Sequence, residues 1–233
     1  MRNVLPSGPG VCSICHTFID PEYTVCYPCR NQPNHLNAVV PITYSENLGQ
    51  MHTALRNYKD GHITVQNYAL PRLTGILWRF AAAHEGCVAR ASGVAGFDVV
   101  ATVPSSAPER DDQRANLRTM VEWSGPLKGR FLRVLRSTGE GEPGRSYDES
   151  RYVAPERLDG MDVLLIDDTW TAGGHAQSAA HALRAAGADH VGAIVIGRHV
   201  RPEWKVAEQT CAALLAALPK AFDWDTCAVH HGS

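Results

Sequence analysis

Four cysteines near the N-terminus restrict the possible folds of this chain more than any other feature. Cys12 and Cys15 form one C-x-x-C pair, and Cys26 and Cys29 form a second pair after ten intervening residues. Two such pairs facing each other provide four sulfur ligands in a tetrahedral arrangement that suits Zn²⁺. The segment between the pairs is too short to bury much apolar surface, so we expect metal binding and folding to be coupled. Because all four positions would be ligands, the pattern predicts a structural rather than a catalytic zinc ion.

Two other interpretations of these cysteines stay open, namely a redox-active dithiol and a pair of disulfides. The chain has seven cysteines in all, and an odd number argues against a closed framework of disulfides. The remaining three are isolated in the sequence, and we expect them to be packing residues: Cys87, Cys211 and Cys227.

The rest of the chain alternates short apolar runs with helical patterns. We predict strands over 98–103, 131–135, 163–166 and 191–196, and helices over 71–91, 110–123, 174–186 and 204–218. This alternation predicts an α/β fold in which a parallel sheet is flanked by helices. Pro33 and Asn34 mark the end of the cysteine-rich segment. We therefore predict a zinc ribbon at residues 1–36 and a larger domain at residues 37–233.

Composition and charge narrow the classes of function. Of the 233 residues, 44% are hydrophobic and 20% are charged, as in a globular protein. The 22 Lys and Arg residues nearly balance the 24 Asp and Glu residues, which argues against a protein that coats nucleic acid through its bulk charge. No apolar run approaches the ~18–20 residues that cross a bilayer, and no signal peptide is recognisable. We therefore expect a cytoplasmic protein without a membrane partner.

The segment after residue 166 carries the clearest chemical signal. Asp167 and Asp168 follow the predicted strand at its carboxyl end, where parallel sheets bind their ligands. A turn and the start of a helix come next, and their backbone N–H groups can bind a phosphate dianion. The residues of this predicted phosphate loop are Thr171, Ala172, Gly173, Gly174 and His175.

The two carboxylates suit a different part of the ligand. Carboxylates accept hydrogen bonds from vicinal hydroxyls and also suit a hydrated Mg²⁺ ion, whereas they repel phosphate. A phosphate loop beside a diol-binding acid pair describes a site for ribose 5-phosphate. No Lys follows the glycines, so the loop is not of the Walker A type, and the G-x-G-x-x-G spacing of dinucleotide folds is also missing.

The segment Val163–His175 resembles the phosphoribosyl-pyrophosphate (PRPP) motif of type I phosphoribosyltransferases. The cysteine-rich segment, together with Leu55–Gly61, is further similar to the ComF-like, competence-associated branch of that family. The resemblance implies a phosphoribosyltransferase that uses PRPP with Mg²⁺ and transfers the 5-phosphoribosyl group to a nitrogen acceptor. It also implies that Asp167 and Asp168 hold the ribose hydroxyls and that residues 171–175 bind the 5′-phosphate. In the same way, residues 137–152 would be a flexible hood, and the pyrophosphate would be bound by Pro104, Ser105 and Ser106.

Two positions and one segment depart from the family pattern. His175 stands where Thr or Ser is usual, and Ala172 replaces a frequent hydroxyl residue. The R-G-F-N-Q segment of ComF-like proteins is absent, and residues 109–112 bring three acids close to the expected pyrophosphate. We expect Arg110 and Arg114 to compensate for this negative charge.

Several alternatives stay open at the level of function. A catalytically silent protein could sense PRPP or a nucleotide and signal through a partner, and a role with single-stranded DNA in uptake is implied by the ComF resemblance alone. A homo-oligomer is also left open. For Tyr58 and Lys59, a pyrophosphate contact competes with an exposed turn, which we take as the expectation. Trp170 would either stack on a base or pack in the interior.

Overall fold

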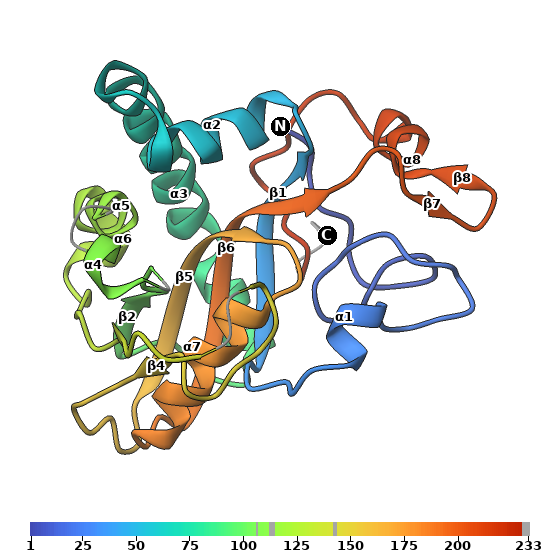
Figure 1. Cartoon of the computed structure of the whole chain (residues 1–233). Coiled ribbons are helices and arrows are strands. Elements are labelled where there is room, and N and C mark those ends of the chain that lie inside the picture. The colour runs from blue at the N-terminus through green and yellow to red at the C-terminus, as the bar shows by residue number, and fades with distance from the viewer. Residues whose placement is uncertain (106, 112–114, 142–143, 230–233) are drawn as a thin grey trace.

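A parallel sheet of four strands forms the centre of the computed structural model, which describes residues 1–105, 107–111, 115–141 and 144–229 (Figure 1). Within these residues the strand order is β1-β6-β5-β2, and all three pairings are parallel. The predicted α/β class, with a parallel sheet flanked by helices and an N-terminal cysteine cluster, is therefore confirmed. The strands are β1 (Ala38–Glu46), β2 (Val99–Thr102), β5 (Asp162–Trp170) and β6 (His190–Val200).

Side chains of each strand alternate between the two faces of the sheet, and both faces are covered. In β5, Val163 and Leu165 belong to one buried cluster, while Leu164 and Ile166 belong to the other. Burial on both sides explains why the strand sequences are continuous hydrophobic runs. The same alternation continues to the end of β5, so the consecutive residues Asp167 and Asp168 point to opposite faces of the sheet.

Helices that come before and after the central strands cover the first face. Leu73, Leu77 and Phe80 form a helical stripe at spacings of four and three residues, and this stripe is almost fully buried against the sheet. The helices on this face are α2 (Gln50–Asp60), α3 (Ile63–Ala91), α5 (Asn116–Trp123), α6 (Gly125–Lys128) and α8 (Cys211–Ala217).

The second face is covered by α7 (Gly174–Ala185) and by the cysteine-rich segment, which includes the short helix α1 (Tyr27–Arg30). Figure 1 shows α1 and its loops beside the sheet, on the side where β1 lies. The cysteines of this segment share one buried cluster with Leu165 and with the alanines of α7. The side chain of Gln177 and the amide of His35 are also hydrogen-bonded, at 2.7 Å. The cysteine-rich segment thus covers the same face of the sheet as α7, the helix that follows β5.

Two helix predictions were wrong at their boundaries, and one predicted strand is almost absent. The helix predicted over 204–218 begins only at residue 211, because the preceding residues form a hairpin of β7 (Lys205–Val206) and β8 (Gln209–Thr210) with Ala207 at φ +50°. The strand predicted over 131–135 is reduced to one bridge between Phe131 and Val100. Helix α3 begins eight residues before Pro71, because His62 caps it by accepting from the Thr64 amide.

Short elements complete the chain. The segment 138–151 is closed at its base by an antiparallel pair of β3 (Arg136–Ser137) and β4 (Tyr152–Val153). Helix α4 (Pro108–Asp111) follows β2, and α5 begins at residue 116. Residues 112–114 of the helix predicted over 110–123 lie outside the described residues. None of the helices in the described part of the chain combines the length and the apolar composition that a bilayer span requires.

Candidate functional site

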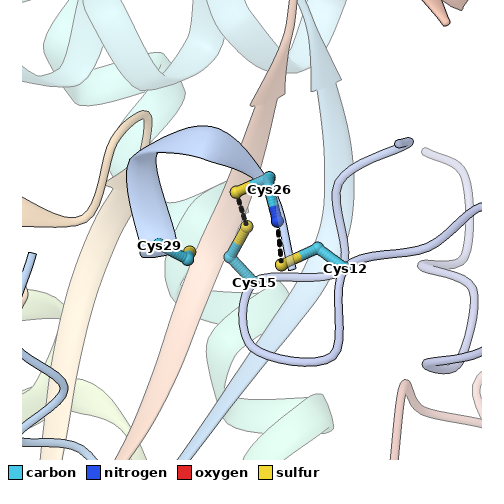
Figure 2. A group of neighbouring side chains, drawn as sticks. All are labelled: Cys12, Cys15, Cys26 and Cys29. Carbon is cyan, nitrogen blue, oxygen red and sulfur yellow. Dashed lines mark hydrogen bonds between the residues drawn. The ribbon is translucent and has the colours of Figure 1, made fainter. Parts of the chain in front are cut away.

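The four N-terminal cysteines lie together as their spacing predicts (Figure 2). Their sulfur atoms are all within 4.8 Å of one another, and those of Cys15 and Cys26 are 3.6 Å apart. A tetrahedral zinc site with Zn–S bonds of ~2.3 Å places sulfurs about 3.8 Å apart. The backbone N–H of Cys26 also donates to the sulfur of Cys12 at 3.3 Å, a bond that favours a thiolate. The cluster is buried and is compatible with the structural zinc of a zinc ribbon.

Arg198, near the end of β6, joins the cysteine cluster to the loop after β5. Its Nη2 donates to the sulfur of Cys15 at 3.3 Å, and its Nε donates to the Cys15 carbonyl at 2.9 Å. Its Nη1 donates to the carbonyl oxygens of Trp170 at 3.0 Å and Thr171 at 3.2 Å. Burial opposes the charge of Arg198, but attraction to Cys15 and its neighbours outweighs it and raises the pKa of Arg198. A buried guanidinium therefore positions the loop relative to the cysteine cluster.

A cleft of about 740 Å³ lies at the carboxyl ends of β2, β5 and β6. This is the edge at which parallel sheets bind ligands. The walls come from the loops after these strands and from the end of α2, and both signs of charge are present. Among the described residues, the charged side chains that line the cleft are Arg56, Lys59, Arg118, Arg145, Arg201, Asp60, Asp111, Asp167, Asp168 and Glu203.

The turn between β5 and α7 depends on its two glycines. Gly173 has φ +91°, and a Cβ at this position would collide with the indole ring of Trp170. Trp170 is buried beneath the turn, so it packs in the interior and does not offer a stacking surface. The first backbone N–H groups of a helix have no acceptor within that helix. In α7 these are the N–H groups of Gly174, His175 and Ala176, and all three residues line the cleft. The positive end of the helix dipole is therefore directed at this wall.

Replacing Gly174 by alanine is expected to displace the loop that covers the turn. A Cβ at position 174 would collide with the carbonyl of Arg145 and the backbone of Ser146, which cannot move without shifting the loop. We expect a loss of ~1–3 kcal/mol in unfolding free energy, measured by urea denaturation. Gly75 is the matched control because a Cβ there meets open space in the interior of α3, so Gly75→Ala should keep or raise stability. Equal stability of the two variants would contradict this packing.

The two aspartates at the end of β5 have different surroundings, because consecutive strand residues point to opposite faces. Asp168 is 4% exposed, accepts a hydrogen bond from the Tyr58 hydroxyl and forms an ion pair with Lys59. Asp167 is half-buried on the α7 side, and its Oδ1 accepts the Asp168 amide at 2.8 Å. Burial and, next, the charge of Asp168 raise the pKa of Asp167 to about 7. Both carboxylates line the cleft.

Tyr58 and Lys59 are site residues that the sequence prediction underrated. They lie in the last turn of α2 and not in an exposed turn, and Tyr58 is 2% exposed. Burial opposes the charge of Lys59, but attraction to Asp168 outweighs it and raises the pKa of Lys59. Their role depends on how α2 packs against β5, across more than a hundred residues of sequence, so no local pattern could have indicated it.

His175 connects three segments around the cleft. Its Nδ1 is 2.9 Å from the hydroxyl of Tyr152, which donates in turn to the Pro104 carbonyl at 3.1 Å. Arg151 places Nη1 3.3 Å from His175 Nε2. Burial and, next, the charge of Arg151 lower the pKa of His175 to about 4. The imidazole is therefore neutral near pH 7. It joins Arg151 and Tyr152 to the turn after β5 and, through the Tyr152 hydroxyl, to Pro104 after β2. The backbone N–H of His175 lies at the start of α7.

The depressed pKa of His175 predicts a loss of stability in acid. The unfolded chain takes up a proton at this side chain near pH 6.5, whereas the folded chain does so only near pH 4. The contribution is therefore complete above pH 6.5 and disappears as the pH falls towards 4. Between pH 7.5 and pH 5 we expect wild type to lose ~1–2 kcal/mol more unfolding free energy than His175→Asn. Urea denaturation at both pH values measures this difference, and parallel losses in the two proteins would refute it.

The loop after β2 is held by a buried carboxylate. Asp111 accepts the backbone N–H of Ser105 at 3.0 Å and forms ion pairs with Arg118 at 2.8 Å and Arg133 at 2.9 Å. Two arginines that the sequence prediction did not name, Arg118 and Arg133, thus neutralise Asp111. The expected compensation by Arg110 and Arg114 stays a prediction, because it falls outside the described side chains. Pro104 and Ser105 line the cleft. Ser106 and Arg114, which belonged to the sequence prediction, lie outside the described residues.

Comparisons with known proteins add no relative to this picture. No protein-family model matches the chain, and no curated protein matches it either. The assignment of a function therefore depends on the geometry of the cleft and on the sequence motifs themselves.

Proposed function

We propose that this chain is a type I phosphoribosyltransferase of the ComF-like branch. It binds PRPP and transfers the 5-phosphoribosyl group to a nitrogen acceptor, with release of pyrophosphate. One observation carries most of this proposal: the N-terminus of α7 and the two aspartates of β5 line the same cleft. The resemblance of residues 163–175 to the PRPP motif supports the same assignment.

The 5′-phosphate is assigned to the start of α7. The amides of Gly174, His175 and Ala176 have no acceptor within the helix, and the helix dipole favours an anion at this position. Thr171 and Ala172 extend the wall of the cleft towards β5. Gly173 permits the close approach of the backbone because its φ of +91° is readily adopted only by glycine.

The ribose hydroxyls are assigned to the aspartates, with unequal roles. Asp167 is the more exposed of the two and, above its raised pKa of about 7, accepts hydrogen bonds from a hydroxyl as a carboxylate. Asp168 is buried, pairs with Lys59 and accepts from Tyr58, so its carboxylate is less available to a hydroxyl than that of Asp167. This division of roles was not expected from the sequence, where the two acids form an equivalent pair.

The pyrophosphate is assigned to the loop after β2 and the surrounding cations. Arg56, Lys59 and Arg145 line the cleft and can attract the polyphosphate. Mg²⁺, entering with PRPP, would neutralise the charge that develops on the leaving pyrophosphate. The carboxylate of Asp167 provides the oxygen donors that Mg²⁺ or its bound water prefers.

The protein groups contribute mainly position and shielding. An oxocarbenium-like state at C1′ needs little acid–base chemistry from the protein, since orientation of the acceptor and exclusion of water provide most of the rate. The segment 137–152 has Arg145 and Ser146 against Gly174, and its Arg151 and Tyr152 contact His175. We assign it the role of the hood over the reacting atoms.

The proposed activity is tested by release of pyrophosphate. Purified protein, PRPP and Mg²⁺ are combined with a panel of nucleobases and amines, and pyrophosphate is measured with a coupled assay. We expect release above the acceptor-free rate with at least one nitrogen acceptor, and no release without Mg²⁺. PRPP binding without release for any acceptor would refute the transferase activity while leaving the binding site in place.

That second outcome describes the alternative function, a sensor of PRPP or a nucleotide. The observation that favours it is the Ser105 amide, which donates to Asp111 and is therefore not directed at a pyrophosphate in this conformation. A sensor would bind PRPP and change conformation without turnover. The acceptor panel separates the two functions directly.

A further inference from the structure

A second group of metal-ligating side chains lies between α3 and the segment that follows α8. His84, Cys87 and Cys227 place one ligand atom each within 4.8 Å of the other two. All three residues are buried, with exposed fractions of 3%, 7% and 7%. None of them lines the cleft, so this group is separate from the proposed PRPP site. The sequence prediction treated both cysteines as packing residues because the third ligand is distant in the chain.

The geometry within α3 prepares two of these ligands. His84 and Cys87 are three residues apart and therefore lie on the same face of the helix, with Cys87 Sγ at 3.8 Å from His84 Nδ1. His84 Nε2 is 2.9 Å from the carbonyl oxygen of Trp224, to which it can only donate. That bond leaves the lone pair on Nδ1, facing the sulfur. A metal-bound histidine is commonly oriented in this way, with its other ring N–H bonded to a carbonyl.

The contacts and the chemical types of the three side chains also suit a metal site. Arg90 donates through Nη2 to the sulfur of Cys87 at 3.3 Å, which fixes the position of that sulfur beside His84. Two sulfurs and one imidazole nitrogen are soft to intermediate ligands, a set that suits Zn²⁺ and not Mg²⁺ or Ca²⁺.

We propose that His84, Cys87 and Cys227 bind a second Zn²⁺ ion. Binding would convert the two thiols to thiolates and release their two protons to solvent. The ion would connect α3 to the segment after α8, which other contacts already hold in place. Arg79 lies 4.3 Å from the ring centre of Trp224, and Asn3 donates to the Asp223 carbonyl at 2.7 Å. The site would therefore fix the C-terminal segment against both α3 and the N-terminal residues.

Metal content of the purified protein tests this proposal. We expect two zinc ions per chain in wild type by inductively coupled plasma mass spectrometry and one in Cys227→Ser. Cys211→Ser is the matched control, because Cys211 is a buried thiol of the same hydrophobic cluster that belongs to neither ligand group, and it should keep two ions. One zinc ion in wild type, two in Cys227→Ser, or stoichiometric copper in place of the second zinc would overturn the proposal.

Alkylation of the wild-type protein provides a test that does not depend on a variant that folds. With zinc bound, Cys87 and Cys227 should react with iodoacetamide at least ten-fold more slowly than after chelation, as measured by mass spectrometry of their peptides. Cys211 should react at the same rate in both conditions. Equal rates for Cys87 and Cys227 with and without chelator, or a disulfide between them, would overturn the second zinc site.

Discussion

The substitution Cys12→Ser is expected to unfold the cysteine-rich segment. A structural zinc site contributes ~10–16 kcal/mol to folding in zinc-finger peptides, and the loss of one of four thiolates should remove more than about 5 kcal/mol of it. The effect should reach beyond residues 11–36, because Cys15 is joined through Arg198 to the carbonyls of Trp170 and Thr171. Amide hydrogen exchange measures the extent of this unfolding. The amides of residues 11–36 should lose protection, and the amides of residues 170–172 should exchange faster than in wild type.

The control for this prediction is Cys211→Ser, which removes a buried thiol outside the cluster. It should leave the exchange of residues 11–36 and 170–172 unchanged. If Cys12→Ser retained full protection in both segments, the four cysteines would not form a structural metal site.

The substitution Asp167→Asn is expected to weaken PRPP binding about 100-fold. At a pH above the raised pKa of Asp167, which is about 7, the change removes a charged acceptor for ribose hydroxyls, and each hydrogen bond to a charged group contributes ~1.5–3 kcal/mol. Asp167 is the informative position because Asp168 also neutralises Lys59, so Asp168→Asn would disturb the protein as well as the ligand. Isothermal titration with PRPP, with and without Mg²⁺, measures the effect.

Asp189→Asn is the matched control for this titration. Asp189 is exposed and precedes β6, at the opposite end of the sheet from the cleft. It should bind PRPP as wild type does, and Asp167→Asn/Asp168→Asn should bind no more tightly than Asp167→Asn. Equal PRPP affinity in wild type and in the double variant would remove the ribose assignment.

Local sequence patterns predicted the parts of this molecule that depend on neighbours in the chain. The two C-x-x-C pairs predict a four-sulfur cluster because each turn fixes two ligands. The apolar run ending at Ile166 and the glycines at 173 and 174 predict a strand, a turn and a helix for the same reason. Both patterns fix short segments, and the structure contains these elements.

Local patterns could not predict the contacts between segments that are distant in the sequence. The ion pair of Lys59 with Asp168 requires α2 to pack beside the end of β5. The bonds of Arg198 require the cysteine-rich segment to lie on the face that also holds the loop after β5. The helix predicted over 204–218 failed for a local reason, since its alanine-rich pattern did not reveal the hairpin at its start.

A crystal structure with Mg²⁺ and PRPP tests the central claim most directly. We expect the 5′-phosphate on the amides of Gly174, His175 and Ala176, with the ribose hydroxyls within hydrogen-bond distance of Asp167. A PRPP molecule bound elsewhere, or one in the cleft with its pyrophosphate on the start of α7, would contradict it.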